Sequence, residues 1–165
     1  MTDELFDVVD AADRVIGQLP RSEVHRRGLL HRAVQVFVFN SRGELLIHRR
    51  SATKDECPLL WTSSASGHVA AGESYDDCAP REMREEIALS APLERLAKFP
   101  ASAETSNEHT VLYRAVTDDA PRFDPVEIAQ GTFLPLITIA EMIAADPLRF
   151  TPVFRLMFRW YRENG

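Results

Sequence analysis

Residues 74–89 carry two side-chain patterns at once, and together they restrict the fold more than any other part of the sequence. Apolar side chains recur every fourth residue, at Ala79, Met83 and Ile87. This spacing predicts a helix whose apolar stripe packs on a sheet. The neighbouring face of the same helix carries three carboxylates, at Glu82, Glu85 and Glu86. Like charges within about a 100° arc repel one another, so we expect either screening by solvent or a cation between them.

Local signals indicate where this helix begins. Ser74 is followed three residues later by Asp77, a capping-box-like pattern that predicts a helix start at Ser74. The chain enters it from an irregular connection between Gly67 and Gly72. Pro80 conflicts with a helix interior because proline has no N–H donor. We therefore expect a kink at Pro80 or a helix that starts later.

Strand patterns lie on both sides of this helix. Two hairpins are expected before it, one from residues 5–10 and 14–19, the other from residues 33–40 and 44–50. Further strands are expected at residues 93–99, 109–116 and 131–136. Strands before, between and after helices predict an α/β fold with a central mixed sheet covered on both faces.

Two helices are expected at the carboxyl end of the chain. Thr138 and Glu141 form a capping box for a helix over residues 139–145. Thr151 and Pro152 open a second helix that extends to residue 164. The core-facing stripe of this last helix consists of Val153, Phe154, Met157 and Trp160.

Length and charge narrow the functional classes. The 165 residues match one domain, which we expect to span residues 1–165 as a hairpin extension (1–30) and a core (31–165). A net charge of −6 disfavours nucleic acid as a partner. No apolar run is long enough to span a membrane, and the acidic amino terminus is unlike a signal peptide, so we expect no membrane partner and a cytoplasmic location. Cys57 and Cys78 have no metal-ligand spacing.

The acidic helix and the loop before it contain a longer pattern. Its fixed positions are Gly67, Glu73, Arg81, Glu82, Met83, Glu85, Glu86 and Leu89. In this spacing the segment resembles the signature of the Nudix hydrolase family, which also places a glycine where this chain has Ala88. That difference affects the turn after the helix if the position needs a positive φ, which alanine adopts reluctantly.

The resemblance implies a Nudix-type α/β/α sandwich with an added amino-terminal β-hairpin, and a metal-dependent hydrolase of diphosphate linkages. By matching positions, Glu82, Glu85 and Glu86 are expected to bind Mg²⁺, or Mn²⁺ in its place, and Glu85 or Glu86 also to activate water. Hard divalent cations prefer such oxygen ligands. Glu73 and Arg81 are expected to form a structural pair, although an i, i+4 pair of Arg81 with Glu85 is the alternative. A nucleoside diphosphate derivative or a similar organic diphosphate is the expected small-molecule substrate.

The resemblance extends to the branch that contains isopentenyl diphosphate isomerase and isomerase-like Nudix hydrolases. The residues that carry it are His31, Arg49, Arg50, Lys54, Trp61, Gly67 and His68. In the isomerase a cysteine precedes this Gly-His pair, whereas this chain has Ser66, which lacks the pKa and polarisability of a thiol. The isomerase also does not usually keep all the glutamates. Hydrolysis is therefore favoured, with isomerase-like activity and a non-catalytic nucleotide-sensing module as alternatives.

Other residues are candidates for substrate or metal. Guanidinium and ammonium groups suit phosphate oxygens, so we expect Arg49, Arg50 and Lys54 to bind substrate, with a solvated strand end as the alternative. His31 and His68 are expected to face the site, and with His25 they are candidates for a second metal, since the isomerase uses histidines for one. Glu127, ahead of Glu108, is the candidate extra carboxylate. Candidates for stacking on a base are Trp61, Phe99, Tyr113 and Phe133. The amino-terminal hairpin is a candidate surface for a homodimer.

Overall fold

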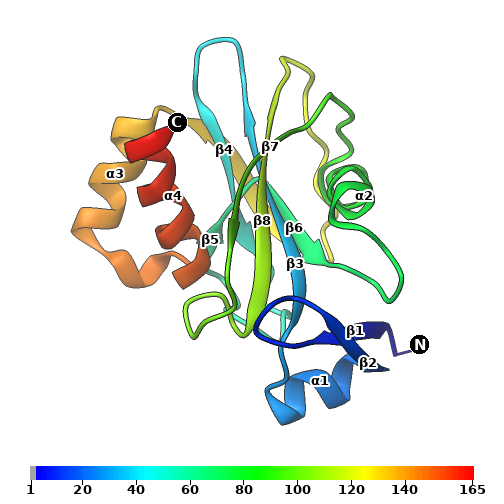
Figure 1. The fold of residues 1–165 in the computed structure, drawn as a ribbon. Coiled ribbons are helices and arrows are strands. Elements are labelled where there is room, and N and C mark those ends of the chain that lie inside the picture. The colour runs from blue at the N-terminus through cyan, green and yellow to red at the C-terminus, as the bar shows by residue number, and fades with distance from the viewer. Residues whose placement is uncertain (1–2) are drawn as a thin grey trace.

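A computed structural model describes residues 3–165 and contains one large mixed sheet (Figure 1). The main path runs β5-β4-β3-β8-β7, with β6 also paired to β3 and β9 to β4. β3 and β8 are parallel and the other pairs are antiparallel. The strands are β3 (His31–Phe39), β4 (Leu45–Arg50), β5 (Trp61–Thr62), β6 (Ala65–His68), β7 (Glu94–Phe99), β8 (Glu108–Val116) and β9 (Ile128–Leu134).

Helices cover both faces of this sheet, as the sequence predicts. α2 (Tyr75–Ile87) lies on one side, and α3 (Leu136–Ala145) and α4 (Pro152–Asn164) lie on the other (Figure 1). A short 3₁₀ helix, η1 (Pro147–Arg149), joins α3 to α4. The predicted α/β/α sandwich with a central mixed sheet is therefore confirmed.

The alternation of side chains along β3 builds a core on each face. Val34, Val36 and Val38 belong to the same buried cluster as the α2 stripe of Ala79, Met83 and Ile87. Phe37 and Phe39 belong to the other cluster, which includes Phe154 and Met157 of α4. Because successive strand residues point to opposite faces, β3 is buried on both sides and fixes the distance between the two helix layers.

The amino-terminal segment forms a separate two-stranded sheet, which confirms the predicted hairpin. β1 (Leu5–Val9) pairs antiparallel with β2 (Val15–Pro20). The chain then forms a short helix, α1 (Arg21–Arg27), which ends at Gly28 in a left-handed conformation. No helix was predicted from the sequence in this segment. Val24 of α1 packs with Phe6 and Val8 in a small apolar cluster.

Two expectations about helix starts are wrong: the later start of α2, which was the alternative to a kink at Pro80, and the start of α3 at a Thr138 cap. α2 runs without a late start through Pro80, because the burial of its apolar stripe outweighs the local preference of proline. The Ser74 cap is as predicted, since its side chain accepts a hydrogen bond from the Asp77 N–H at 3.1 Å. α3 begins at Leu136 and has no side-chain cap, so Thr138 lies inside the helix. Leu136 packs against the apolar cluster and extends the helix backwards.

The other predicted helix and strands are present, with ends that differ from the expected ones by up to three residues. Thr151 caps α4 by accepting a hydrogen bond from the Phe154 N–H at 3.2 Å. β7, β8 and β9 confirm the three later strands, with β9 starting at Ile128. β3 and β4 face each other only through Phe39 and Leu45, because most of β3 pairs with β6 and β8.

Candidate active site

The three carboxylates of α2 lie together at a polar pocket beside the end of β6. Glu82, Glu85 and Glu86 all line it. The other residues of its wall are Glu4, Arg21, Arg50, Lys54, Glu56, Ser66, Gly67, His68, Asp124 and Glu127. We call this the acidic pocket. The helix supplies the carboxylates because one face packs on the sheet and turns the neighbouring face toward β6.

Burial changes the proton affinity of two of these glutamates. Burial raises the pKa of Glu86 to about 8, and the carboxylates of Glu82 and Glu127 add to the rise. The Ser66 N–H opposes it by donating to Glu86 Oε1 at 2.7 Å. Burial also raises the pKa of Glu82 to about 7, against the attraction of Arg81. A hard divalent cation prefers oxygen ligands and would stabilise the ionised form of crowded, partly buried carboxylates. The donor set therefore fits such a cation.

Gly67 allows β6 to approach these carboxylates closely. A Cβ atom at this position would lie 2.1 Å from Glu82 Cδ. No side chain can occupy that space unless Glu82 moves. The glycine of the sequence pattern is therefore explained by close approach of backbone to side chain.

Arg81 joins the loop before α2 to the helix. Its Nε and Nη2 donate to the two carboxylate oxygens of Glu73, at 2.7 and 2.9 Å. Glu73 also accepts a hydrogen bond from the Ala70 N–H at 3.0 Å, which closes the loop. Arg81 Nη1 donates to Glu82 Oε1 at 2.9 Å and to Glu85 Oε2 at 3.1 Å. The two contacts considered from the sequence are thus both present.

The cationic side chains divide between two sites. Arg50 and Lys54 line the acidic pocket, and Lys54 forms an ion pair with Glu127. Arg49, the neighbour of Arg50 on β4, donates instead to the Leu59 carbonyl at 3.0 Å and lines another pocket. Adjacent strand residues point to opposite faces, so only Arg50 of the two arginines lines the acidic pocket. Arg21, at the start of α1, also lines the acidic pocket, and it was not singled out from the sequence.

The two extra carboxylates considered from the sequence lie in different places. Glu127 and Asp124 line the acidic pocket. Glu108 lies at the start of β8, where its Oε2 is 3.6 Å from His68 Nε2. Burial raises the pKa of Glu108 well above its ordinary value, and the Glu56 carboxylate adds to the rise.

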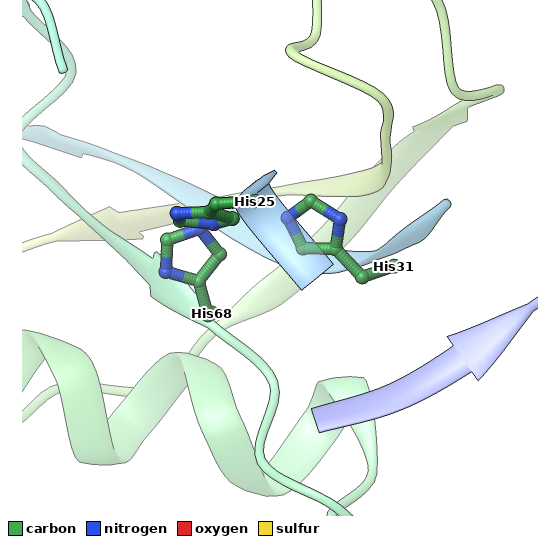
Figure 2. A group of neighbouring side chains, drawn as sticks. All are labelled: His25, His31 and His68. Atoms are coloured by element: carbon green, nitrogen blue, oxygen red, sulfur yellow. The ribbon is translucent and has the colours of Figure 1, made fainter. Parts of the chain in front are cut away.

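The described residues also bring three histidines together. Figure 2 shows the rings of His25, His31 and His68 beside one another. They come from α1, β3 and β6, and one nitrogen from each lies within 4.8 Å of the others. Phe6 of the hairpin supports the group by stacking on His31, with ring centroids 5.7 Å apart. These are the three histidines that the resemblance made candidates for a second metal, although their spacing in the sequence gives no geometry.

The protonation of these rings suits a metal ligand. The Nδ1 of His31 donates to the Leu29 carbonyl at 2.9 Å, which leaves its Nε2 as an acceptor in the neutral ring. The Nε2 atoms of His25 and His31 are buried without a hydrogen-bond partner. Burial lowers the pKa of His31 to about 4 and that of His68 well below its ordinary value, so both rings are neutral at pH 7. The group therefore fits a divalent cation with nitrogen ligands.

Four aromatic residues were considered for base stacking. None of them is among the described residues that line the acidic pocket. Trp61, Phe99 and Tyr113 are buried, and Phe133 packs against the α2-side cluster. Their place in the core explains them.

Comparison with known proteins agrees with this geometry. The family model described as the NUDIX domain matches residues 29–154. An isopentenyl-diphosphate Delta-isomerase of Serratia proteamaculans is 33% identical over 157 residues, covering 92% of this chain and 88% of that protein. An uncharacterised Nudix hydrolase of Pseudomonas aeruginosa is 37% identical over 132 residues, covering 79% and 78%. The crystal structure of DR0079 from Deinococcus radiodurans superposes with a TM-score of 0.78 at 33% identity, covering 87% and 90%.

The chain therefore belongs to the Nudix family, and its enzyme class is that of the Nudix hydrolases. Enzymes of this family hydrolyse pyrophosphate linkages in small molecules and generally use divalent metals. Among residues 3–165, none of the helices has the length and apolar character needed to cross a membrane.

Proposed function

We propose that this chain cleaves the diphosphate linkage of a nucleoside diphosphate derivative or a similar organic diphosphate, with Mg²⁺ at the carboxylates of α2. The observation that carries the proposal is that Glu82, Glu85 and Glu86 line one pocket together with Arg50 and Lys54. Cleavage of a diphosphate requires charge on phosphate oxygens to be neutralised while water attacks phosphorus. The acidic pocket supplies both kinds of group that this requires.

The side chains take different roles in this reaction. Glu82, Glu85 and Glu86 would hold the cation, with Mn²⁺ as the alternative to Mg²⁺. When bound, the cation withdraws charge from the phosphate oxygens. Glu85 or Glu86 accepts a proton from the attacking water, and the bond from phosphorus to the leaving oxygen breaks. Arg50, Lys54 and also Arg21 bind the remaining phosphate oxygens.

The Arg81–Glu73 pair positions these groups. Its two short hydrogen bonds tie the loop that follows β6 to the middle of α2. The same guanidinium reaches Glu82 and Glu85, which reduces their mutual repulsion before a cation binds. We therefore assign it a structural role beside the chemistry.

The three histidines are proposed to hold a second divalent cation. The support is the close group of nitrogens and the two unpartnered Nε2 atoms. His31→Gln should lower the amount of metal retained after purification, measured by elemental analysis. Metal retention equal to that of the parent protein would contradict this assignment.

Isomerisation of isopentenyl diphosphate is the second candidate function. It is favoured by the named isomerases among the relatives and by the histidine group close to Ser66. Against it stands the absence of a thiol at Ser66, since a serine hydroxyl is a poor proton donor and acceptor at carbon. A sensing module without catalysis is the third candidate, which the complete set of glutamates disfavours.

One experiment separates the three candidates. Phosphate-bond cleavage is measured across nucleoside di- and triphosphates, dinucleotides, nucleotide sugars and isopentenyl diphosphate, with Mg²⁺ and with chelator. We expect cleavage of at least one compound, lost with chelator and in Glu86→Gln, and kept in Glu141→Gln, a control on the exposed side of α3. A double-bond shift in isopentenyl diphosphate, without cleavage, supports the isomerase. Binding without turnover supports the sensing module.

A further inference from the structure

A second recess adjoins the acidic pocket on the other side of β6. The two share Arg50, Glu56, Ser66, Gly67 and His68 as wall residues. The second recess extends under the amino-terminal end of α4, where Thr151, Pro152 and Val153 line it. The shared wall leaves space in the second recess for the organic group of a diphosphate bound at the acidic pocket. We call this space the α4 recess.

Gln35 lines the α4 recess with a side-chain oxygen that has no hydrogen-bond partner. It lies on β3 between Val34 and Val36, which face α2, so its side chain points toward the α4 side. The side chain is 7% exposed, and its Oε1 is buried without a hydrogen-bond partner. Buried polar atoms without partners are uncommon and cost free energy. An unpartnered amide that lines a recess therefore points to a group supplied by a ligand.

The rest of the lining favours the same kind of ligand. Among the described residues that form the recess, none is Phe, Tyr or Trp, so no indole, phenol or phenyl face is available for a base to stack on. Side-chain hydroxyls are frequent, at Thr62, Ser66, Thr105, Ser106, Thr110 and Thr151. The carboxylates of Glu56 and Glu104 outnumber the guanidinium of Arg50. Carboxylates accept hydrogen bonds when ionised, which favours a ligand rich in donors.

We propose that the α4 recess binds a small hydroxylated group, such as a sugar or polyol, and that Gln35 determines this specificity. A hydroxyl both donates and accepts, so it satisfies either end of the Gln35 amide. An alkyl or alkenyl group would leave the amide unpartnered. A diphosphate ester of a polyol is therefore the preferred substrate class. The inference rests on the proposed function for the diphosphate and on Gln35 for the organic group.

Binding of two matched esters tests the proposal. The diphosphate monoesters of glycerol and 1-propanol differ only in hydroxyls, and their affinities are measured by calorimetry with Mg²⁺. The Glu86→Gln background prevents turnover. We expect the glycerol ester to bind about tenfold or more tightly than the propyl ester. Gln35→Met, which keeps the side-chain length without the amide, should reduce that ratio to about one. Gln130→Met, the same change outside both pockets, should leave the ratio unchanged.

A second variant and a stability measurement distinguish loss of the amide contact from loss of folding. Gln35→Asn keeps the amide but withdraws it by one methylene, and it should also lose the preference. Thermal unfolding of Gln35→Met should occur no lower than in the parent, because the amide makes no hydrogen bond to lose. Equal binding of the two esters in the Glu86→Gln background, an unchanged ratio in both Gln35 variants, or tighter binding of isopentenyl diphosphate would overturn the inference.

The outcome is separable from the proposed hydrolysis. Selective binding that depends on Gln35, without cleavage of any diphosphate by the parent protein, would remove the proposed function and leave the specificity assignment standing. Cleavage that depends on Mg²⁺ and Glu86, without any preference for the hydroxylated ester, would remove the specificity assignment alone.

Discussion

Replacing Ala88 by glycine should stabilise the protein. Ala88 ends α2 with φ 56° and ψ 33°, the left-handed conformation. The Ala88 N–H donates to the Arg84 carbonyl at 3.1 Å, and the Leu89 N–H points back to the Met83 carbonyl at 3.5 Å, the pattern of a glycine-type helix end. This end requires a positive φ, which an L side chain opposes. The glycine of the family signature is missing where the backbone needs it.

The magnitude follows from two opposing terms. The left-handed conformation costs a residue with a Cβ roughly 1 to 2 kcal/mol. Glycine offsets this gain by about 0.5 to 1 kcal/mol, because it gives the unfolded chain more conformational freedom to lose on folding. Ala88 is exposed, so its methyl group contributes little burial. We expect Ala88→Gly to raise the free energy of unfolding by about 0.5 to 1 kcal/mol, and Tm by about 1 to 4 °C for a chain of this size.

Calorimetry or urea denaturation measures the effect, with Ala144→Gly as a matched control. Ala144 is exposed near the end of α3, where the same substitution should destabilise by about 0.5 kcal/mol. Opposite signs for one substitution at two exposed positions isolate the backbone conformation as the cause. A loss of stability in both variants would refute the reasoning about Ala88.

Three further predictions concern the acidic pocket. Gly67→Ala should lower the free energy of unfolding by about 1 to 3 kcal/mol and impair Mg²⁺ binding, because the new Cβ meets Glu82 of α2. Gly17→Ala is the matched control: its Cβ has nothing within 4 Å, so Tm should change little. Arg81→Lys should lower kcat/KM about tenfold or more, since an ammonium cannot form the fork with its paired carboxylate, whereas Arg84→Lys on the exposed side should not. For the metal-free protein, kept so by a chelator, Glu86→Gln should raise the free energy of unfolding above pH 8 by on the order of 1 to 3 kcal/mol. Thermal denaturation measures this difference.

The sign of the Glu86 effect follows from linkage. Its pKa is about 8 in the folded protein and 4.5 ordinarily. Between these values the folded protein retains a proton that the unfolded chain has lost, so the stability of the metal-free protein falls as pH rises. Glutamine does not titrate, so the advantage of Glu86→Gln should vanish near pH 4 and grow toward pH 8. Excess Mg²⁺ should stabilise the parent more than the variant. A constant advantage at every pH would contradict this account.

Local patterns made the acidic helix predictable. The apolar stripe, the Ser74 cap and the carboxylate face all depend on residues within about four turns of one another. The same reasoning missed α1, which is short and buries only Val24. It also placed the start of α3 too late, because the cap pattern at Thr138 was considered without the packing of Leu136. Tertiary contacts decide such ends.

Long-range geometry accounts for the rest of the site. The strand period implies that Arg49 and Arg50 point to opposite faces, but only the order of strands shows which face holds the carboxylates. The histidines come from three elements, α1, β3 and β6, so no spacing along the chain could reveal their proximity. Gln35 gave no signal at all, since a polar residue within an apolar strand is visible as a site only when its lack of partners is known.

The position of β6 between the two pockets links the candidate functions. Gly67 faces α2 and the carboxylates, whereas Ser66 lies opposite Gln35 and points to the α4 side. The backbone N–H of Ser66 still donates to Glu86. One strand therefore borders the proposed phosphate site through its backbone and the proposed site of the organic group through the Ser66 side chain. Hydrolysis at phosphorus would use the backbone contact with Glu86. Isomerisation at carbon would need a proton-transferring side chain at the position of Ser66. A hydroxyl at Ser66, with the unpartnered amide of Gln35 beside it, equips the second contact for recognition rather than proton transfer.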